Sequence, residues 1–515
     1  MKKEDLVKRK DAKVAKKKVL IGLSWPYANG RLHIGHIASS LPADALARFH
    51  RMIGNEVSFV TGSDCYGTPI LVRAIAEGTT PELLAEKYHA FHSKDFKALG
   101  FTFDNYDKTL SERHHTFVRD FHTQMYKGGY IYEKSASQLY CEKCTQFLPD
   151  RYVEGTCPFC KKDAKGDSCD SCGKILEPED LEAPRCVLCN NAPIAREQTQ
   201  LYLKLSSLQD KIQQFFDERK DNWTNNAAGM TQRYLTEGLR DRAITRSIDW
   251  GIPVPRDGWE DRRIYIWAEN VLGYLSASEP KFIEDKNALH YYVHAKDNIP
   301  FHSIILPALI MAHGERYHLP DIIAASEYVT IGGSKISKSK GTQIYAHTLY
   351  EQFDVDMVRY YFLRTVSDKR DSNFTYEEFV NLVNGELVNN FGNLVNRTLS
   401  FIKTKFDNKI PKKSTERGIQ EDYIDYMMQG NVNRALNCVM ELVNFGNKYF
   451  AEKKPWETND KTVIAEIIDI IQCATKMLKP FIPFACAKVQ KWLASKTLPE
   501  IEILFKRLDI KEVLQ

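Results

Sequence analysis

The sequence lacks any long hydrophobic run. No apolar stretch among its 515 residues approaches the roughly 18 residues that a membrane-spanning helix needs, and no apolar segment follows the basic N-terminus as in a signal peptide. A mitochondrial transit peptide is also disfavoured, because residues 1–18 contain no Ser, one Arg and three acidic side chains. We therefore expect a soluble, cytoplasmic protein without a membrane partner.

The usual nucleotide-binding motifs are missing as well. The phosphate loop GxxxxGK[ST] does not occur anywhere in the chain, and neither does a convincing GxGxxG. These absences disfavour phosphate-loop nucleotidases and the common dinucleotide-binding enzymes. A nucleotide site in this protein would have to be built from other groups.

Cysteine is scarce outside one segment. Of the 12 cysteines, eight form CxxC pairs: Cys141 and Cys144, Cys157 and Cys160, Cys169 and Cys172, and Cys186 and Cys189. In a large cytoplasmic protein such pairs are typical zinc ligands, and eight thiolates predict two closed, structural four-cysteine Zn²⁺ sites. A redox pair is the alternative for any one CxxC. The four pairs can combine two by two in three ways, and the spacing does not decide among them.

Charge is concentrated in the N-terminal tail. Residues 1–18 carry nine Lys or Arg and three acids, a net +6, so the whole-chain charge of +4 leaves about −2 for the remainder. We expect a disordered solubilising tail, and contact with a nucleic-acid backbone is the alternative. With 43% apolar residues, the chain is long enough for two or three domains.

Hydrophobic periodicity predicts an α/β fold followed by helices. Residues 19–24 resemble a buried strand, residues 36–54 a helix with a possible irregularity at Pro42, and residues 56–64 a second strand. This βαβ unit predicts a Rossmann-like parallel sheet with its ligand at the carboxyl ends of the strands. From Thr375 onward, long amphipathic stretches predict a separate helical bundle.

These patterns divide the chain into expected parts. They are a tail (1–18), a first catalytic half (19–135), a zinc-knuckle insertion (136–195), a connective segment with the second catalytic half (196–325), a lysine-loop subdomain (326–376) and an all-α domain (377–515).

Two histidines lie where the first strand gives way to the helix, in the stretch "SWPYANGRLHIGH". His33 and His36 could be a metal pair or could be satisfied locally by backbone groups. Nucleotide binding is favoured, because a helix N-terminus attracts phosphates and imidazole N–H groups add donors beside it. Gly35 would let a flat adenine approach the backbone.

A second loop supplies positive charge. The stretch "IGGSKISKSKGT", residues 331–342, places Lys335 and Lys338 between glycines. Such lysines can cover a triphosphate and stabilise the charge that develops as pyrophosphate leaves. On its own, this loop could equally be an ordinary solvated segment.

Together, "HIGH" and "KISKS" on an α/β framework resemble the paired signatures of class I aminoacyl-tRNA synthetases. The resemblance implies that ATP, with Mg²⁺, is held by His33, Gly35, His36, Lys335 and Lys338, and that Lys338 stabilises the transition state. The implied reaction is attack of an amino-acid carboxylate on the α-phosphate, followed by transfer to the terminal ribose of tRNA.

Four further segments, "PYANG", "GSDCYGTP", "IYIW…GY" and "KDNIPFHS", resemble the methionyl-tRNA synthetase family, and the resemblance covers the chain after residue 18. It implies ATP, L-methionine and tRNA(Met) as substrates. It implies that the methionine pocket is lined by Tyr27, Trp267, Tyr274 and His302. It also implies that Asp64 holds the substrate ammonium, that Asp297 lies near the ATP ribose and that Arg246 contacts the adenylate. Trp25 also lines the pocket, where the family usually has Leu.

The chain departs from the family pattern at Trp25, Asn270, Val271 and Ile336. These changes are reminiscent of leucyl, isoleucyl and valyl relatives, which share both signatures but carry a long editing domain for which this chain has no room. A synthetase for another aliphatic amino acid therefore remains one alternative. A non-catalytic RNA-binding paralogue is another, and the intact histidines and lysines argue against it.

The resemblance also orders the cysteines and the helices. It implies that the two central CxxC pairs form an inner zinc site and the two flanking pairs an outer one, a nested arrangement. In the helical domain it nominates Asn393, Arg397 and Trp456 for contact with the anticodon, by stacking and cationic contact. The tRNA-binding barrel that dimerises some relatives does not follow the bundle, so we expect a monomer.

Overall fold

The computed structural model describes residues 16–513 except residues 168, 170, 175, 333, 336–342 and 412–416. The predicted catalytic Lys338 and most of the basic tail lie outside the described residues. Lys335 is described as part of a short strand, without its side chain.

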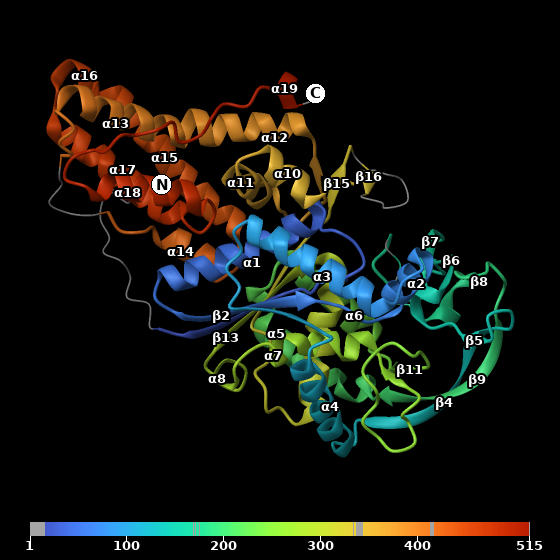
Figure 1. Ribbon diagram of the computed structural model, residues 1–515. Coiled ribbons are helices and arrows are strands. Elements are labelled where there is room, and N and C mark those ends of the chain that lie inside the picture. Colours follow the sequence, from blue (N-terminus) through green and yellow to red (C-terminus); the bar gives the residue numbers. More distant parts are fainter. Residues whose placement is uncertain are drawn as a thin grey trace.

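A five-stranded parallel sheet forms the centre of the molecule (Figure 1). Its strands, in spatial order, are β14 (Ile322–Ser326), β13 (Leu289–Ala295), β1 (Lys18–Leu23), β2 (Glu56–Ser63) and β3 (Asn105–Lys108), and each neighbouring pair is parallel. Successive apolar residues of β1 point to opposite faces and enter two different cores. The predicted strands at 19–24 and 56–64, and the parallel sheet that they imply, are confirmed.

Helix α1 (Ile34–Met52) packs on β1, β2 and β13. It begins two residues before the predicted start, because the histidine side chains form its N-terminal cap. Pro42 lies inside the helix and is buried there. The opposite face of the sheet is covered by the core that contains α4 (Glu112–Lys127), α7 (Gly273–Ser276) and α9 (Leu306–His313).

The cysteine-rich segment is carried on a long antiparallel ribbon. Strands β4 (Ile131–Cys141) and β9 (Ile194–Leu203) pair along their length and carry the cysteine clusters at their far end (Figure 1, right). A small sheet of β7 (Asp163–Lys165), β6 (Val153–Thr156) and β8 (Glu182–Cys186) lies between the clusters. The insertion packs on α2 (Thr68–Glu77).

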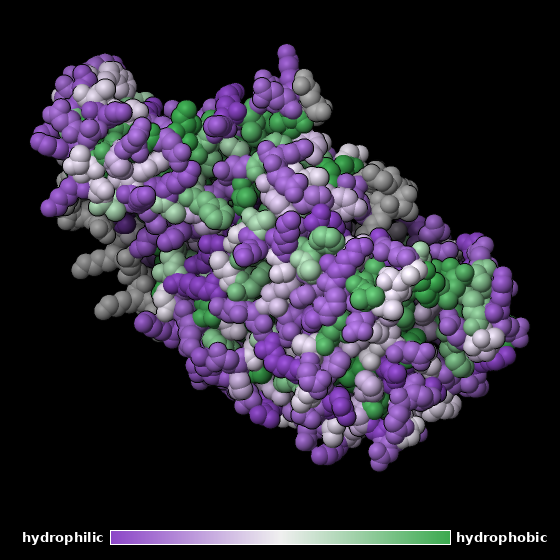
Figure 2. Space-filling model, in the orientation of Figure 1, coloured by the Kyte–Doolittle hydropathy of each residue, from purple (hydrophilic) through white to green (hydrophobic). Residues whose placement is uncertain are grey.

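The C-terminal part of the chain, from Tyr376 onward, is a helical bundle, as predicted. Its helices include α12 (Tyr376–Leu382), α13 (Asn393–Lys405), α15 (Val432–Lys453), α17 (Lys461–Leu478) and α18 (Pro483–Ala494). Their apolar faces share one core with α1. Among the described residues, no helix combines the length and the apolar character needed to cross a membrane. Figure 2 shows a largely hydrophilic surface on the face drawn.

A buried arginine joins the helical bundle to the parallel-sheet region. Arg359, on α11 (Val355–Thr365), is fully buried and donates to the carbonyl oxygens of Leu99, Pro480 and Phe481. It also pairs with Asp44 of α1, with 2.6 Å between the guanidinium and the carboxylate. This pair lowers the pKa of the otherwise desolvated Asp44 carboxyl. The bundle is therefore fixed to the catalytic region by hydrogen bonds as well as by apolar packing.

Candidate active site

A cavity of about 290 Å³ opens at the carboxyl ends of β1 and β13. Parallel sheets bind ligands at this edge, as the sequence predicted. The residues singled out from the sequence that line it are Trp25, Tyr27, His33, Gly35, His36, Trp267 and Asp297. Segments far apart in the sequence therefore meet around one space, although Asp64, Arg246, Tyr274 and His302 are not among its lining residues.

The two histidines cap the helix that follows them. The Nδ1 atom of His33 accepts the backbone N–H of Gly35 at 3.1 Å, and Nδ1 of His36 accepts the backbone N–H of His33 at 3.1 Å. Because both Nδ1 atoms are acceptors, each neutral ring carries its proton on Nε2. This tautomer supplies two N–H donors at a helix N-terminus, which is the arrangement an anionic phosphate requires.

The described ends of the lysine loop adjoin these histidines. Val329, at the start of the hairpin β15 (Val329–Ile331) and β16 (Ser334–Lys335), lines the cavity. After the loop, the backbone N–H of Ile34 donates to Ile344 at 3.0 Å and that of Ala346 donates to Leu32 at 2.8 Å. Both ends of the predicted phosphate loop therefore lie at the same cavity as the histidine pair.

Trp25 is fitted into a slot between two glycines. A Cβ atom on Gly62 would lie 2.6 Å from the indole ring, and one on Gly273 would lie 2.8 Å from it. Larger residues at either position would displace the ring, so Trp25 is accommodated by its neighbours although the family usually has Leu there. Trp25 also contacts Tyr274 edge-on, with 6.5 Å between ring centroids.

Tyr274 and His302 form a buried neutral pair behind Trp25. Nδ1 of His302 donates to the carbonyl oxygen of Asn298 at 2.9 Å, so its Nε2 accepts the hydroxyl of Tyr274 at 2.7 Å. Burial lowers the pKa of His302 to about 4 and raises the pKa of Tyr274. The aromatic wall is therefore uncharged at neutral pH.

Asp64 lies beside the segment that carries Tyr27. Its backbone exchanges hydrogen bonds with Pro26 and Ala28, and its carboxyl is only 1% exposed. Burial, and then the nearby carboxyl of Glu269, raise the pKa of Asp64 well above its usual value. A buried carboxylate next to an open cavity is a site for a cation.

Glu269 has its own partner. Its Oε1 lies 2.5 Å from Nε2 of His114, and both side chains are buried. Burial lowers the pKa of His114 to about 3 and raises that of Glu269 well above its usual value. The pair is therefore neutral, with the Glu269 carboxyl donating to the imidazole.

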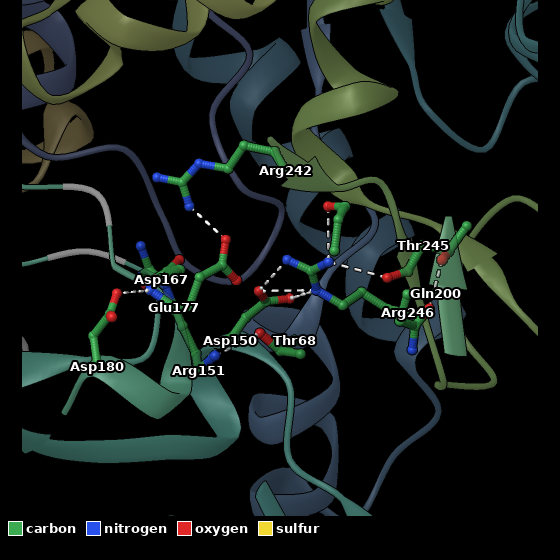
Figure 3. A network of polar contacts seen from close by, with 11 residues as sticks. Thr68, Asp150, Arg151, Asp167, Glu177, Asp180, Gln200, Arg242, Thr245 and Arg246 are labelled. Carbon is green, nitrogen blue, oxygen red and sulfur yellow. Dashed lines mark hydrogen bonds and ion pairs between the residues drawn. The ribbon is translucent and has the colours of Figure 1, made fainter. Parts of the chain in front are cut away.

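Two arginines lie next to Asp150, and only one of them, Arg246, was nominated from the sequence. Arg246, on β11 (Thr245–Arg246), is buried and holds Asp150 through three contacts of 3.0–3.1 Å (Figure 3). Its contact with an adenylate remains a prediction. Arg151, which sequence reasoning missed, does line the cavity. Its only sequence signal is its position beside Asp150 in the cysteine-rich insertion, which motif searches pass over.

The eight cysteines form two clusters in the nested arrangement that the resemblance implied. Within each cluster the four Sγ atoms lie within 4.8 Å of one another, and the individual contacts are 3.5–3.9 Å. Four thiolates around zinc at about 2.3 Å per bond would be about 3.8 Å apart, so both clusters fit a tetrahedral ion. The inner knuckle is defined here as residues 157–172, and Cys141, Cys144, Cys186 and Cys189 form the outer site.

Each CxxC turn is closed by a residue in left-handed conformation. The residues after the four turns are Thr145, Lys161, Gly173 and Asn190, with φ values of 53°, 59°, 72° and 62°. Only Gly adopts this conformation without strain. In the inner knuckle the backbone N–H of Lys162 bonds the Cys160 thiol and lowers its pKa to about 7, which favours the thiolate that a metal requires.

The bundle residues nominated from the sequence lie around one row of rings. Arg397 stacks over Phe450, with 3.9 Å between the guanidinium carbon and the ring centroid, and Phe450 stacks on Trp456 with centroids 5.9 Å apart. Trp456 is 47% exposed, and Asn393 lies exposed one helical turn before Arg397. Sequence reasoning missed Phe450, because a buried aromatic residue on a helix resembles any other core residue.

Comparison with known proteins gives consistent results. Residues 19–399 match the family described as tRNA synthetases class I (M). The protein named methionine–tRNA ligase 1 of Alkaliphilus oremlandii is 41% identical over 96% of this chain and 98% of that protein. Methionine–tRNA ligase of Bacillus mycoides is 41% identical over 96% of this chain and 97% of its own length.

The fold is also found among solved structures. That of Mycobacterium tuberculosis methionyl-tRNA synthetase in complex with methionyl-adenylate has a TM-score of 0.77 at 24% identity, over 95% of this chain and all of that chain. Its apo form gives a TM-score of 0.71 at 22% identity. The sequence matches and the fold agree, and the chain therefore belongs to the class I aminoacyl-tRNA synthetases, within the methionyl-tRNA synthetase family.

Proposed function

We propose that the protein is a methionine–tRNA ligase acting on ATP, L-methionine and tRNA(Met). A carboxylate oxygen of methionine attacks the α-phosphorus of ATP, the bond to the β-phosphate breaks, and pyrophosphate leaves from methionyl-adenylate. A hydroxyl of the 3′-terminal ribose of tRNA then attacks the carbonyl carbon, and AMP leaves. Neither step requires a protein nucleophile, so positioning and charge stabilisation provide the catalysis.

One observation carries this proposal. The cavity at the carboxyl ends of β1 and β13 combines the helix-capping histidines with the aromatic rings of Trp25, Tyr27 and Trp267. A phosphate and an apolar side chain thus have complementary surfaces within one space of about 290 Å³.

The chain's own groups divide the work of activation. Nε2–H of His33 and of His36 donate to phosphate oxygens, Gly35 leaves room for the adenine, and Asp297 accepts from the ribose. Lys335 and Lys338 neutralise the charge of the departing pyrophosphate. Mg²⁺ accompanies ATP and shields its phosphates. Arg246, which holds Asp150, contacts the adenylate at its carboxyl or phosphate side.

Methionine recognition relies on an uncharged wall and one buried anion. The rings of Tyr27, Trp267 and Tyr274, together with neutral His302, surround a polarisable thioether, which makes favourable contacts with aromatic edges. Trp25 narrows the same wall. Asp64 holds the substrate ammonium and thereby orients the carboxylate toward the phosphate. Longer or charged side chains would meet either a ring or a desolvated surface.

The two cysteine clusters hold structural zinc in this proposal. All four ligands of each cluster are thiolates at tetrahedral spacing, so no coordination position is left for a substrate. The bundle takes the anticodon of tRNA(Met) through Asn393, Arg397 and the exposed face of Trp456, because a stacked base needs such a platform and a cation near it. A monomer in the cytoplasm is the corresponding assembly and location.

Exchange of labelled pyrophosphate into ATP tests the proposal. The full-length protein should catalyse exchange with methionine, and should be at least about 100-fold less active with leucine, isoleucine or valine. Exchange with none of the four amino acids would instead support a non-catalytic RNA-binding paralogue. Exchange with leucine alone would contradict the assignment of the pocket. Elemental analysis should find two zinc ions per chain, as expected from two clusters.

A further inference from the structure

The inner knuckle packs directly on a turn at the edge of the catalytic cavity. The backbone N–H of Gly166 donates to the carbonyl oxygen of Val153 at 3.0 Å. A Cβ atom at Gly166 would lie 2.2 Å from the carbonyl oxygen of Asp150, so only glycine permits this approach. The loop between the two inner cysteine pairs therefore meets the Asp150–Arg151 turn backbone to backbone.

This turn is strained and is held from two other sides. Asp150 has a φ of 52°, a left-handed conformation that is unfavourable for a residue with a side chain. Arg246 binds its carboxylate through three contacts, and the backbone N–H of Arg151 donates to Thr68 of α2 at 3.2 Å (Figure 3). These contacts fix the backbone of Arg151 independently of its side chain.

The side chain of Arg151 is oriented by the inner knuckle. Its Nε donates to the Asp167 carboxylate at 2.8 Å, and its guanidinium lies 5.8 Å from the ring centroid of Tyr27. Asp167 is only 7% exposed, whereas Arg151 is 26% exposed and lines the cavity that holds both histidines. Asp167 lies two residues before Cys169, which belongs to the inner cysteine cluster. The inner cluster therefore restrains the Asp167 carboxylate that holds Arg151.

We propose that Asp167 is a positioning residue that orients Arg151 to bind a phosphate in the catalytic cavity. This inference rests on the proposed function and adds a positioning residue to the proposed catalytic site. Asp167 holds the Nε side of the guanidinium and so sets the plane of this group, whose forked geometry suits a phosphate. The phosphate belongs either to ATP and its adenylate or to the 3′-terminal backbone of tRNA. In either case the inner knuckle forms part of the wall of the cavity.

Stability alone does not account for this ion pair. Because the Arg151 side chain is 26% exposed, solvent partly screens the pair and limits what it contributes to folding. Removing the carboxylate should therefore appear in catalysis and not in the melting temperature. This difference separates a positioning role from a structural one.

The test is a double-mutant cycle on the zinc-loaded, full-length protein. Asp167→Ala and Arg151→Ala should each slow the same step by roughly 10- to 100-fold, and the double variant should be no slower than Arg151→Ala alone. Asp167→Glu, which keeps the anion, should recover part of the loss. A loss in pyrophosphate exchange assigns the phosphate to ATP, and a loss confined to single-turnover transfer from preformed methionyl-adenylate assigns it to tRNA.

A matched control uses a second ion pair of the insertion. Glu182→Gln removes the partner of Lys161, and neither residue is among those that line the cavity, so the variant should change neither step. Zinc content and melting temperature of every variant should match the parent. Additive losses in the double variant, or an unchanged Arg151→Ala variant, would overturn the inference. A parent protein without methionine-dependent exchange would instead refute the proposed function itself.

Discussion

The catalytic region and the helical bundle place their functional side chains in opposite ways. Around the cavity, buried ionisable groups lie behind the surface: His114 is hydrogen-bonded to Glu269, and Glu269 raises the pKa of nearby Asp64. From α13 to α18, the described residues include only Thr398, Asp469 and Thr475 as buried polar side chains. Both threonines donate within their own helices, to the carbonyl oxygen four residues earlier.

This difference indicates how each region tolerates change. In the bundle an apolar core supports a surface on which Arg397 and Trp456 are displayed, so a surface substitution removes one contact and little else. In the catalytic region one substitution leaves a buried partner without its hydrogen bond. We therefore expect catalytic-region variants to impair amino-acid activation, and bundle variants to impair only the step that needs tRNA.

The largest effect is expected at the lysine loop. Lys338→Ala should slow adenylate formation by roughly 100- to 1,000-fold, because it removes a cation from the developing pyrophosphate, while methionine binding stays nearly intact. Pre-steady-state kinetics and methionine titration measure the two quantities. Lys340→Ala, on the same loop, is the control and should be mild. Equal loss of activation and of methionine binding would mean that the loop has a structural role. The proposed difference between the catalytic region and the bundle would then lose its strongest support.

A smaller effect is expected at the exposed ring of the bundle. Trp456→Ala should lower kcat/KM for tRNA charging by roughly 5- to 150-fold, the usual range for one lost base stack, and should spare pyrophosphate exchange. Trp456→Phe keeps a ring and should recover most of the activity. Ile503→Ala, at another exposed apolar side chain, should be neutral. An unchanged charging rate for Trp456→Ala would remove its assigned role.

The smallest effect concerns pH. Because burial raises the pKa of Asp64, a growing fraction of its carboxyl is protonated as the pH falls, and the ammonium of methionine then loses its anion. KM for methionine should therefore rise as the pH is lowered, whereas KM for ATP should change less.

Two variants sharpen this prediction. Asp64→Asn should raise the methionine KM at every pH and remove the pH dependence. Glu269→Gln resembles the protonated acid that donates to His114, so it should leave the profile nearly unchanged. If Glu269→Gln weakened methionine binding as much as Asp64→Asn, Glu269 would be the anion that holds the ammonium.

Much of the fold could be predicted from the sequence. The apolar residues of β1 follow one another without polar interruption, as a strand buried on both faces requires, and β2 is buried along its last six residues. The amphipathic stretches after Thr375 predict the bundle, because their apolar residues recur with the period of a helix. The nested cysteine clusters could not be derived from spacing, because all three pairings are compatible with the chain length, and the family resemblance was needed.

The candidate site was only partly accessible from the sequence. His33 and His36 belong to one short motif, so the sequence alone predicts that they act together. Arg151 reaches the cavity because a strained turn, a glycine contact and Asp167 combine in space. No local pattern records such a combination. Trp25 looked like a departure from the family, and its fit depends on Gly62 and Gly273, which are distant in sequence.

The reciprocal cap formed by His33 and His36 makes folding and catalysis depend on the same rings. Their Nδ1 atoms cap helix α1, and both residues line the cavity where we propose that ATP binds. A variant of either residue thus loosens the first turn of a helix that packs on three strands, in addition to removing a phosphate donor. Kinetic defects of such variants must be compared with their melting curves, and asparagine, which can also cap a helix, is the informative replacement.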